Sequence, residues 1–162
     1  MQIRAAIEAD LDDIRAIYND VIATTTAAYR DEPVNADERL AWFKARRAAG
    51  FPVLVAVRAR EVLGFAAYGD FRHGSCYRRT VELTVHVKAG ERGKGIGGAL
   101  VEALVAKAGA DGKHTIVASI DADNAPSIRL FKRLGFVEVA HFREVGFKFG
   151  RWLDLVFLER VL

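Results

Sequence analysis

The segment Thr80–Leu100 constrains the fold more than any other part of the chain, and it reads TVELTVHVKAGERGKGIGGAL. Its first eight residues alternate as a β-strand does, and an apolar pattern typical of a helix begins at Gly95. A charged turn crowded with glycines lies between them. Glycines leave backbone amides accessible, and a helix N-terminus carries partial positive charge. The segment therefore predicts a strand, a turn and a helix that together bind an anion.

The rest of the chain predicts a mixed β-sheet with helices on both faces. The predicted strands are Gln2–Ala6, Phe51–Arg58, Val62–Tyr68, Thr80–Val87, Thr115–Ile120 and two segments around Gly146–Gly150. The predicted helices are Asp10–Thr26, Asn35–Gly50, Gly95–Ala110 and Asn124–Leu134. Strands alternate with helices after residue 80 but form hairpins before it, which is the order expected for a mixed sheet. No linker or repeat divides the chain, so a single domain over residues 1–162 is predicted.

Composition favours an ordinary globular protein. The chain has 162 residues, of which 51 % are hydrophobic and 28 % charged. A net charge of +3 suits an anionic ligand but lacks the dense basic runs of a nucleic-acid binder. Cys76 is the only cysteine, which excludes an internal disulfide. Acidic residues stand where a signal peptide would need an apolar run, and no segment reaches the roughly 20 apolar residues of a membrane span, so a cytoplasmic location is expected.

Two nucleotide-binding motifs can be compared with the glycine-rich turn. A Walker-type phosphate loop would need a glycine at the position of Lys88, so that interpretation fails. The dinucleotide pattern G-x-G-x-x-G is present at Gly93, Gly95 and Gly98. However, five residues separate Val87 from Gly93, whereas the first glycine of that pattern should follow its strand at once. A dinucleotide site therefore stays open as the weaker alternative.

A third interpretation starts from Arg92-x-x-Gly95-x-Gly97 directly after a V-x-V strand. This motif resembles the acyl-CoA loop of the GNAT superfamily of N-acetyltransferases, which wraps the pyrophosphate of coenzyme A. The run from Asn124 to Ser127, followed by LGF, resembles the second cofactor segment of that superfamily. The strand TVELTVHV resembles T-V-E-x-[ST]-V-Y-V, a form specific to the phosphinothricin and methionine sulfoximine acetyltransferase branch. Matches at YND (18–20), PVLV (52–55), YGD (68–70) and GFKFGRWLD (146–154) extend this resemblance over nearly the whole chain.

The resemblance implies the GNAT fold, an α/β architecture with a central mixed sheet, and acetyl-CoA as co-substrate with no metal. The cofactor-binding residues that it implies are Val85, His86, Val87, Arg92, Gly93, Lys94, Gly95, Ile96, Gly97, Gly98, Asn124 and Ser127. Backbone amides of Val85–Val87 are the expected donors to the oxyanion that develops on the thioester carbonyl. In many superfamily members a tyrosine seven residues after the asparagine protonates the departing thiolate. Phe131 stands there and has no proton to give, which puts a general acid in doubt.

Glu82 is the expected general base. On a strand Glu82, Thr84 and His86 share one face, and the intervening valines and leucine share the other. Acetyl transfer to an amine needs a deprotonated amine, and a carboxylate can take the proton through a water. The similar branch uses the Glu of T-V-E in this way. His86 lies about 13 Å away along an extended strand, so it is expected only to line the site.

Substrate contacts are expected from Glu82, Thr84 and Arg72. The resemblance places Arg72 on the α-carboxylate of the substrate, and a guanidinium matches a carboxylate in bidentate geometry. At residues 146–154 phosphinothricin enzymes tend to carry His in place of Phe149 and Leu153. The chain therefore resembles more closely the relatives that acetylate methionine sulfoximine and methionine sulfone.

The functional hypothesis is an acetyl-CoA-dependent transferase that acetylates the α-amine of a small L-amino-acid-like substrate by direct attack in a ternary complex. One alternative is a protein or peptide N-acetyltransferase. Another is a non-catalytic acyl-CoA or nucleotide-binding module, although such a module would not need Glu82 as a base. A homodimer is implied by the resemblance alone.

Overall fold

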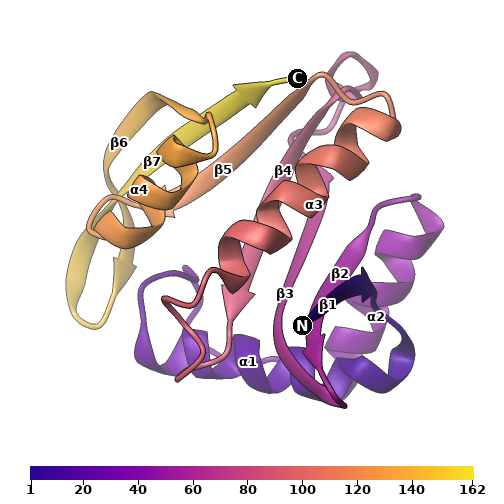
Figure 1. The fold of residues 1–162 in the computed structure, drawn as a ribbon. Helices are drawn as coiled ribbons and strands as arrows, with labels where there is room; N and C mark the ends of the chain where they lie inside the picture. The colour runs from indigo at the N-terminus through magenta and orange to yellow at the C-terminus, as the bar shows by residue number, and fades with distance from the viewer.

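The computed structural model describes residues 1–162 and contains a seven-stranded mixed sheet in the order β1-β2-β3-β4-β5-β7-β6 (Figure 1). The strands are β1 (Gln2–Ala5), β2 (Val53–Arg58), β3 (Glu61–Asp70), β4 (Thr80–Val87), β5 (Thr115–Asp121), β6 (Val137–Lys148) and β7 (Arg151–Val161). Only the β4–β5 pair is parallel, and all other neighbours are antiparallel. The predicted mixed sheet is therefore confirmed.

Two helices cover each face of the sheet. In Figure 1 α3 (Ile96–Ala110) and α4 (Ala125–Arg133) lie in front of the strands, whereas α1 (Leu11–Thr24) and α2 (Ala36–Ala48) lie behind them. Two short 3-10 turns, Glu8–Asp10 and Ser75–Tyr77, complete the regular structure. The second of these turns lies between the predicted strands Val62–Tyr68 and Thr80–Val87, and β3 extends two residues beyond the first of these predicted strands.

Local sequence signals explain where the helices of the rear layer form. In α1 the buried residues Leu11, Ile14 and Ile17 recur at helical spacing and pack in one cluster with residues of the sheet. The side chain of Asn35, the first residue of the predicted helix, accepts a hydrogen bond from the Glu38 amide at 2.8 Å and so caps α2. Gly50, with φ of +75°, follows the end of α2 in the left-handed conformation that glycine adopts most readily.

The sheet separates the two main hydrophobic cores, and a third, small cluster of Val21, Ile22, Ala28 and Val34 lies at the end of α1. The larger core lies between the strands and α3, and it includes Leu83, Leu100 and Leu104. The smaller core lies under α1 and α2 and includes Phe43 and Phe65. Burial of each such side chain contributes roughly 1.5–3 kcal/mol to folding. Leu83 and Phe65 point to opposite faces of the sheet. Because neighbouring residues of a strand alternate between the faces, the residues on either side of Leu83 in β4 point to the face of α1 and α2.

The parallel pair β4–β5 is short. Residues Thr80–Leu83 of β4 pair with Thr115–Ala118 of β5, and the two strands then diverge. In Figure 1 they spread apart below this point, with the glycine-rich turn and the N-terminus of α3 beside the end of β4. The remaining half of β4 keeps its antiparallel partner β3 through Val87. One edge of β4 is therefore unpaired over its last residues.

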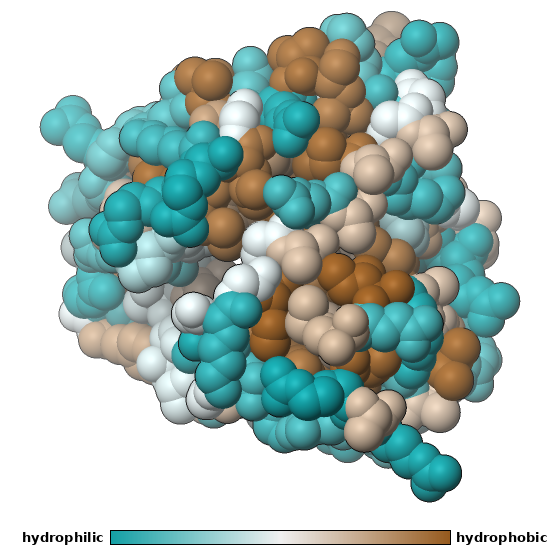
Figure 2. Space-filling model, viewed as in Figure 1, coloured by the Kyte–Doolittle hydropathy of each residue, from teal (hydrophilic) through white to brown (hydrophobic).

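The face that carries α3 and α4 is mixed in polarity. Figure 2 shows separate brown areas on this face, divided by hydrophilic residues, and a pale surface near the glycine-rich turn. None of the helices combines the length and the apolar character that crossing a membrane requires.

Candidate active site

The unpaired edge of β4 offers backbone amides. The Lys88 amide donates to the Leu63 carbonyl of β3. Successive backbone amides along a strand point alternately to its two edges. The amides of Val85 and Val87 therefore point to the opposite edge, which β5 has left. The same alternation turns the His86 amide toward β3. Of the three amides expected from the sequence, the structure leaves two, those of Val85 and Val87, in position to serve a ligand.

The turn after β4 has the backbone of an anion cradle. Gly93 and Gly95 have φ of +77° and +84°, a conformation that residues with a Cβ rarely adopt. A Cβ at either position would meet no atom of the chain within 4 Å, so the space beside both residues is open. Gly95 is the N-cap of α3 and offers no side-chain acceptor to the first amides of the helix. These amides are available to an anion from outside the chain.

Other residues of the predicted cofactor segment have structural partners. Ile96 is buried in the larger core, and Gly97 and Gly98 lie against the side chain of Leu130 in α4. Their small size therefore also permits close packing of α3 on α4. The two cations pair within the chain. The Arg92 Nε donates to the Val87 carbonyl at 3.1 Å, and the Lys94 Nζ lies 3.3 Å from a Glu91 oxygen.

Asn124 and Ser127 form the N-terminal cap of α4. The Asn124 side-chain oxygen accepts a hydrogen bond from the Ser127 amide at 3.3 Å. Both residues are half-buried, at the end of β5 that diverges from β4. Any contact with a cofactor would therefore have to use their remaining polar atoms.

The polar face of β4 lies on the side of α1 and α2. Glu82, Thr84 and His86 share this face, as the sequence predicted, because Leu83 belongs to the opposite core. The Glu82 carboxylate accepts a hydrogen bond from the hydroxyl of Ser119 on β5. Thr84 is exposed although it stands in the middle of the central strand, so the helices leave this part of the sheet uncovered.

His86 is enclosed and uncharged at neutral pH. Its ring lies 5.4 Å from the Tyr18 ring centroid and 5.5 Å from that of Phe65. Burial, together with the positive charges of Arg39 and Arg92, lowers the pKa of His86 to about 4. A base at this position would be surrounded by aromatic rings, which agrees with the expectation that His86 lines the site.

The loop after β3 lies beside Glu82 on the same face. Phe71 packs edge-on against Phe157 of β7, with ring centroids 6.4 Å apart, and Phe157 pairs with Ser119. Arg72 is exposed, forms no ion pair and has its guanidinium 5.2 Å from the Phe71 ring centroid. The structure thus brings Arg72 to the rim of this face without an ion-pair partner inside the chain.

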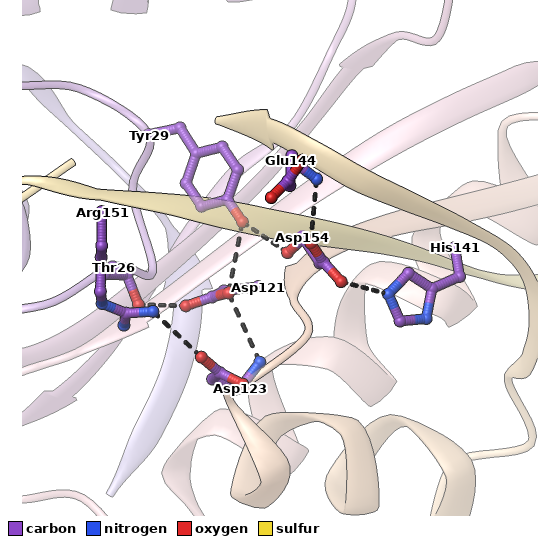
Figure 3. Close-up of polar contacts among 8 residues, drawn as sticks. All are labelled: Thr26, Tyr29, Asp121, Asp123, His141, Glu144, Arg151 and Asp154. Atoms are coloured by element: carbon purple, nitrogen blue, oxygen red, sulfur yellow. Dashed lines mark hydrogen bonds and ion pairs between the residues drawn. The ribbon is translucent and has the colours of Figure 1, made fainter. Parts of the chain in front are cut away.

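The loop after α1 is tied to the ends of the strands (Figure 3). Asp121, which is buried, accepts hydrogen bonds from the hydroxyls of Thr26 and Tyr29. The Tyr29 hydroxyl is also 2.8 Å from the Asp154 carbonyl, and burial raises the pKa of this phenol. The Nζ of buried Lys148 donates to the carbonyls of Thr25 and Ala28, at 2.8 Å each. These contacts fix one wall of the uncovered face.

Phe131 belongs to the core. It is fully buried in α4, and its ring meets that of Phe136 edge-on at 5.0 Å. The position therefore supplies neither a proton nor an exposed polar group, in agreement with the doubt about a general acid there.

Neither Ser119 nor Asp121 is among the residues of the acetyltransferase site that the sequence predicts. Their side chains lie on the face of the sheet that carries Glu82, at alternate positions of the run TIVASID in β5. The alternation of apolar residues with Thr115, Ser119 and Asp121 in this run was a signal that could have shown a polar face.

An unpaired strand edge with free amides, an open glycine turn at a helix N-terminus and a carboxylate on the same strand are features that suit an acyltransferase whose acyl group comes from a phosphate-bearing carrier. The comparisons agree with this class. The model of the Acetyltransferase (GNAT) family matches residues 14–136, and the chain belongs to this family. The predicted fold and family are therefore confirmed.

Three similar proteins span nearly the whole chain. An L-methionine sulfoximine/L-methionine sulfone acetyltransferase of Pseudomonas paraeruginosa is 50 % identical over 158 residues, which is 97 % of this chain and 92 % of that protein. The acetyltransferase yncA of Salmonella typhimurium, solved with its cofactor acetyl-CoA, is 45 % identical with a TM-score of 0.98 and covers 100 % of this chain and 94 % of its own. A ribosomal-protein-alanine N-acetyltransferase from Brucella melitensis is 43 % identical with a TM-score of 0.98, with both chains covered fully.

Proposed function

We propose that residues 1–162 form a single domain that transfers the acetyl group of acetyl-CoA to the α-amino group of a small L-amino acid such as methionine sulfone or methionine sulfoximine. Three observations support this proposal: the family membership, the name of the Pseudomonas relative and the acetyl-CoA found in the Salmonella structure. A cytoplasmic location remains a prediction from the sequence.

The observation that carries the proposal is the position of Glu82. Its carboxylate is held by the Ser119 hydroxyl on a face that Thr84 leaves open, next to the point where β4 loses β5. A carboxylate at this point can accept a proton from an amine while the amides of Val85 and Val87 face the unpaired edge. A protein that only bound an acyl-CoA would have no use for such a base.

The residues of the chain then take separate roles. Acetyl-CoA supplies the acetyl group as a thioester. The amides at the N-terminus of α3 and beside Gly93 and Gly95 hold its phosphates, because they have no acceptor within the chain. The amides of Val85 and Val87 hold the carbonyl oxygen. Glu82 accepts the ammonium proton through a water, which typically contributes 10²–10⁴-fold to the rate. Direct attack by the amine requires no covalent bond to the enzyme.

The test is to mix the purified protein with acetyl-CoA and a panel of amines and to follow the release of free thiol. The panel contains methionine sulfone, methionine sulfoximine, phosphinothricin and the common amino acids. The proposal expects rapid thiol release with at least one sulfur-oxidised amino acid. Absence of release with every member of the panel would contradict it.

A peptide N-terminus is the second candidate substrate, because the Brucella protein is named for a ribosomal protein. The same assay with short peptides that begin with alanine separates the two. A preference for the peptides over every free amino acid would favour this second candidate.

We also propose that the protein is a homodimer through the β6–β7 hairpin. This hairpin exposes a group of large apolar side chains, Val137, Val139, Val145, Phe147, Phe149 and Trp152. Trp152 is 62 % exposed and packs edge-on against Phe147, with ring centroids 4.9 Å apart. Exposed large apolar side chains gathered on one hairpin are typical of protein interfaces.

Light scattering coupled to gel filtration tests this assembly. Trp152→Glu should convert a dimer to a monomer. Ile7→Asp, which changes an exposed apolar residue near the N-terminus and outside the hairpin, should not. A wild-type protein of monomer mass would contradict the dimer.

A further inference from the structure

Helix α2 presents a stack of three side chains toward the face of the sheet that carries Glu82. Arg39, Trp42 and Arg46 follow one another at spacings of three and four residues, which places them on one side of the helix. The Arg39 guanidinium lies 4.4 Å from the Trp42 ring centroid, and the Arg46 guanidinium lies 5.2 Å from it. Arg39 also lies 4.8 Å from the Tyr18 ring centroid. Both guanidinium groups are therefore held by aromatic rings.

Arg46 reaches the strand next to Glu82. A Cβ built on Gly69 would lie 2.8 Å from Nη1 and 3.1 Å from Cζ of Arg46, so the guanidinium rests against the backbone of Gly69. Gly69 is the direct partner of Glu82 in the β3–β4 pair. Directly paired residues point to the same face with Cα atoms about 4.5–5.5 Å apart. The Arg46 guanidinium thus lies one strand away from the base, on the same side of the sheet.

Neither guanidinium has a hydrogen-bond partner within the chain. Arg39 is only 5 % exposed, and the Nε atoms of Arg39 and Arg46 are buried and unbonded. Burial lowers the pKa of both groups, and the charge of Asp70 opposes this for Arg46 without forming an ion pair within 4.0 Å. Buried Lys148, in contrast, donates to two carbonyls. Leaving a buried cation without an acceptor is costly, so an acceptor supplied by a ligand would offset that cost.

We propose that Arg46 binds the carboxylate of the amine substrate, with Trp42 and Gly69 holding its guanidinium in place. This inference rests on the proposed function, because it assigns a role within the same site. It adds a binding residue on α2 to the one expected from the sequence, Arg72, which lies exposed on a loop.

The chemistry favours a carboxylate at this point. In an α-amino acid one carbon separates the amine from the carboxylate, so the carboxylate must lie close to whichever base serves the amine. Arg46 meets this condition through the Gly69–Glu82 pair. Thr84 is exposed beside Glu82, which leaves room for the substrate above this part of β4. A guanidinium fixed by stacking loses little freedom when its two donors bind a carboxylate.

The test compares two amines in the thiol-release assay, L-methionine sulfone and 3-(methylsulfonyl)propylamine, which lacks the carboxylate. In Arg46→Gln the preference for the amino acid, measured as the ratio of the two kcat/KM values, should fall by about 10-fold or more, as expected for the loss of a charge-assisted hydrogen bond. In Arg46→Lys, which keeps the positive charge but loses the planar guanidinium, the ratio should lie between the values of the wild type and Arg46→Gln. Arg47→Gln, one residue away and exposed, is the matched control and should leave the ratio unchanged.

Gly69→Ala provides a second variant that keeps the arginine. Its new Cβ would displace the guanidinium, and the flexible end of Arg46 can move without disturbing the backbone. The preference for the carboxylate-bearing amine should fall here as well. Equal losses for both amines in Arg46→Gln, or an unchanged ratio, would overturn the proposal.

A binding measurement separates this proposal from the proposed function. In a Trp152→Phe variant Trp42 is the only tryptophan, so the fluorescence emission reports on this residue alone. Titration with L-methionine sulfone should change this emission saturably when Arg46 is present, but not when Arg46→Gln is added. If the wild type acetylates no amino acid, the same titration with acetate, glycine and the other amino acids still reports on Arg46. The absence of any Arg46-dependent, saturable change across these carboxylates would contradict the carboxylate site.

Discussion

The Glu82 carboxylate accepts a hydrogen bond from the Ser119 hydroxyl across the boundary between β4 and β5. Ser119 stands one residue beyond Leu83–Ala118, the last pair that joins these strands. The contact therefore lies at the point where the strands separate. It holds the carboxylate at the end of the paired half of β4, next to the residues that have lost β5 as a partner.

Ser119→Ala should lower kcat several-fold, because the carboxylate loses the donor that orients it. A hydrogen bond to a charged group contributes about 1.5–3 kcal/mol, and water can replace part of it at this half-buried position. Steady-state kinetics should show an unchanged KM for acetyl-CoA and recovery of kcat in Ser119→Thr, which restores the hydroxyl. A variant with wild-type kcat would mean that Ser119 does not position the base.

Gly95→Ala should weaken acetyl-CoA binding measured by calorimetry. The φ of +84° strains a residue with a Cβ by about 1–2 kcal/mol, and the new methyl group enters the open space beside the helix N-terminus. Gly90→Ala is the matched control, since Gly90 has the same φ and also meets no atom within 4 Å, but it lies five residues before the N-cap of α3. Both variants should lose similar stability, and only Gly95→Ala should lose affinity. Equal losses of affinity would remove the turn from the binding site.

His86, whose ring is enclosed by aromatic neighbours, should make stability depend on pH. Its pKa is about 4 in the folded chain and 6.5 in the unfolded chain, so between these values the unfolded state binds more protons. The contribution of His86 to the free energy of unfolding is therefore complete above pH 6.5 and is lost as the pH drops toward 4. Urea denaturation should show about 2 kcal/mol lost between pH 7.5 and pH 5 through this residue.

The control for this prediction is His86→Phe, which keeps a ring beside Tyr18 and Phe65 but cannot titrate. Its loss of stability over the same pH interval should be smaller than that of the wild type. Identical pH dependences in the two proteins would show that His86 is not the titrating group.

Lys148→Met should destabilise the protein by about 2–3 kcal/mol, because it leaves the buried carbonyls of Thr25 and Ala28 without a donor. Chemical denaturation of the wild type and the variant measures this loss. Lys132→Met is the control, because Lys132 is exposed and its 3.6 Å ion pair with Glu138 contributes little. Equal stabilities of the two variants would contradict the role assigned to Lys148 in anchoring the loop after α1.

The sequence was sufficient for local structure. The bounds of β4, the Asn35 cap of α2 and the common face of Glu82, Thr84 and His86 all follow from signals within a few residues. Hydrophobic alternation and capping act at this range, so they can be read without knowing the fold.

Relationships between distant segments could not be predicted in this way. The Ser119–Glu82 contact depends on where β4 and β5 diverge, and the Arg46–Gly69 contact depends on how α2 lies on β3. The burial of His86 likewise depends on Tyr18, which is 68 residues away in the chain (86 minus 18). Periodicity assigns each residue to a face but does not specify what packs against that face.

The most direct test of the account is Glu82→Gln, an isosteric change that removes the base. With L-methionine sulfone as the amine, kcat for thiol release should fall by about 10²–10⁴-fold. The dissociation constant for acetyl-CoA, measured by calorimetry on the same samples, should stay within about two-fold, because the amides of Val85, Val87 and the N-terminus of α3 are untouched. A variant that retains wild-type kcat, or that loses acetyl-CoA binding together with activity, would contradict the assignment of Glu82 as the general base.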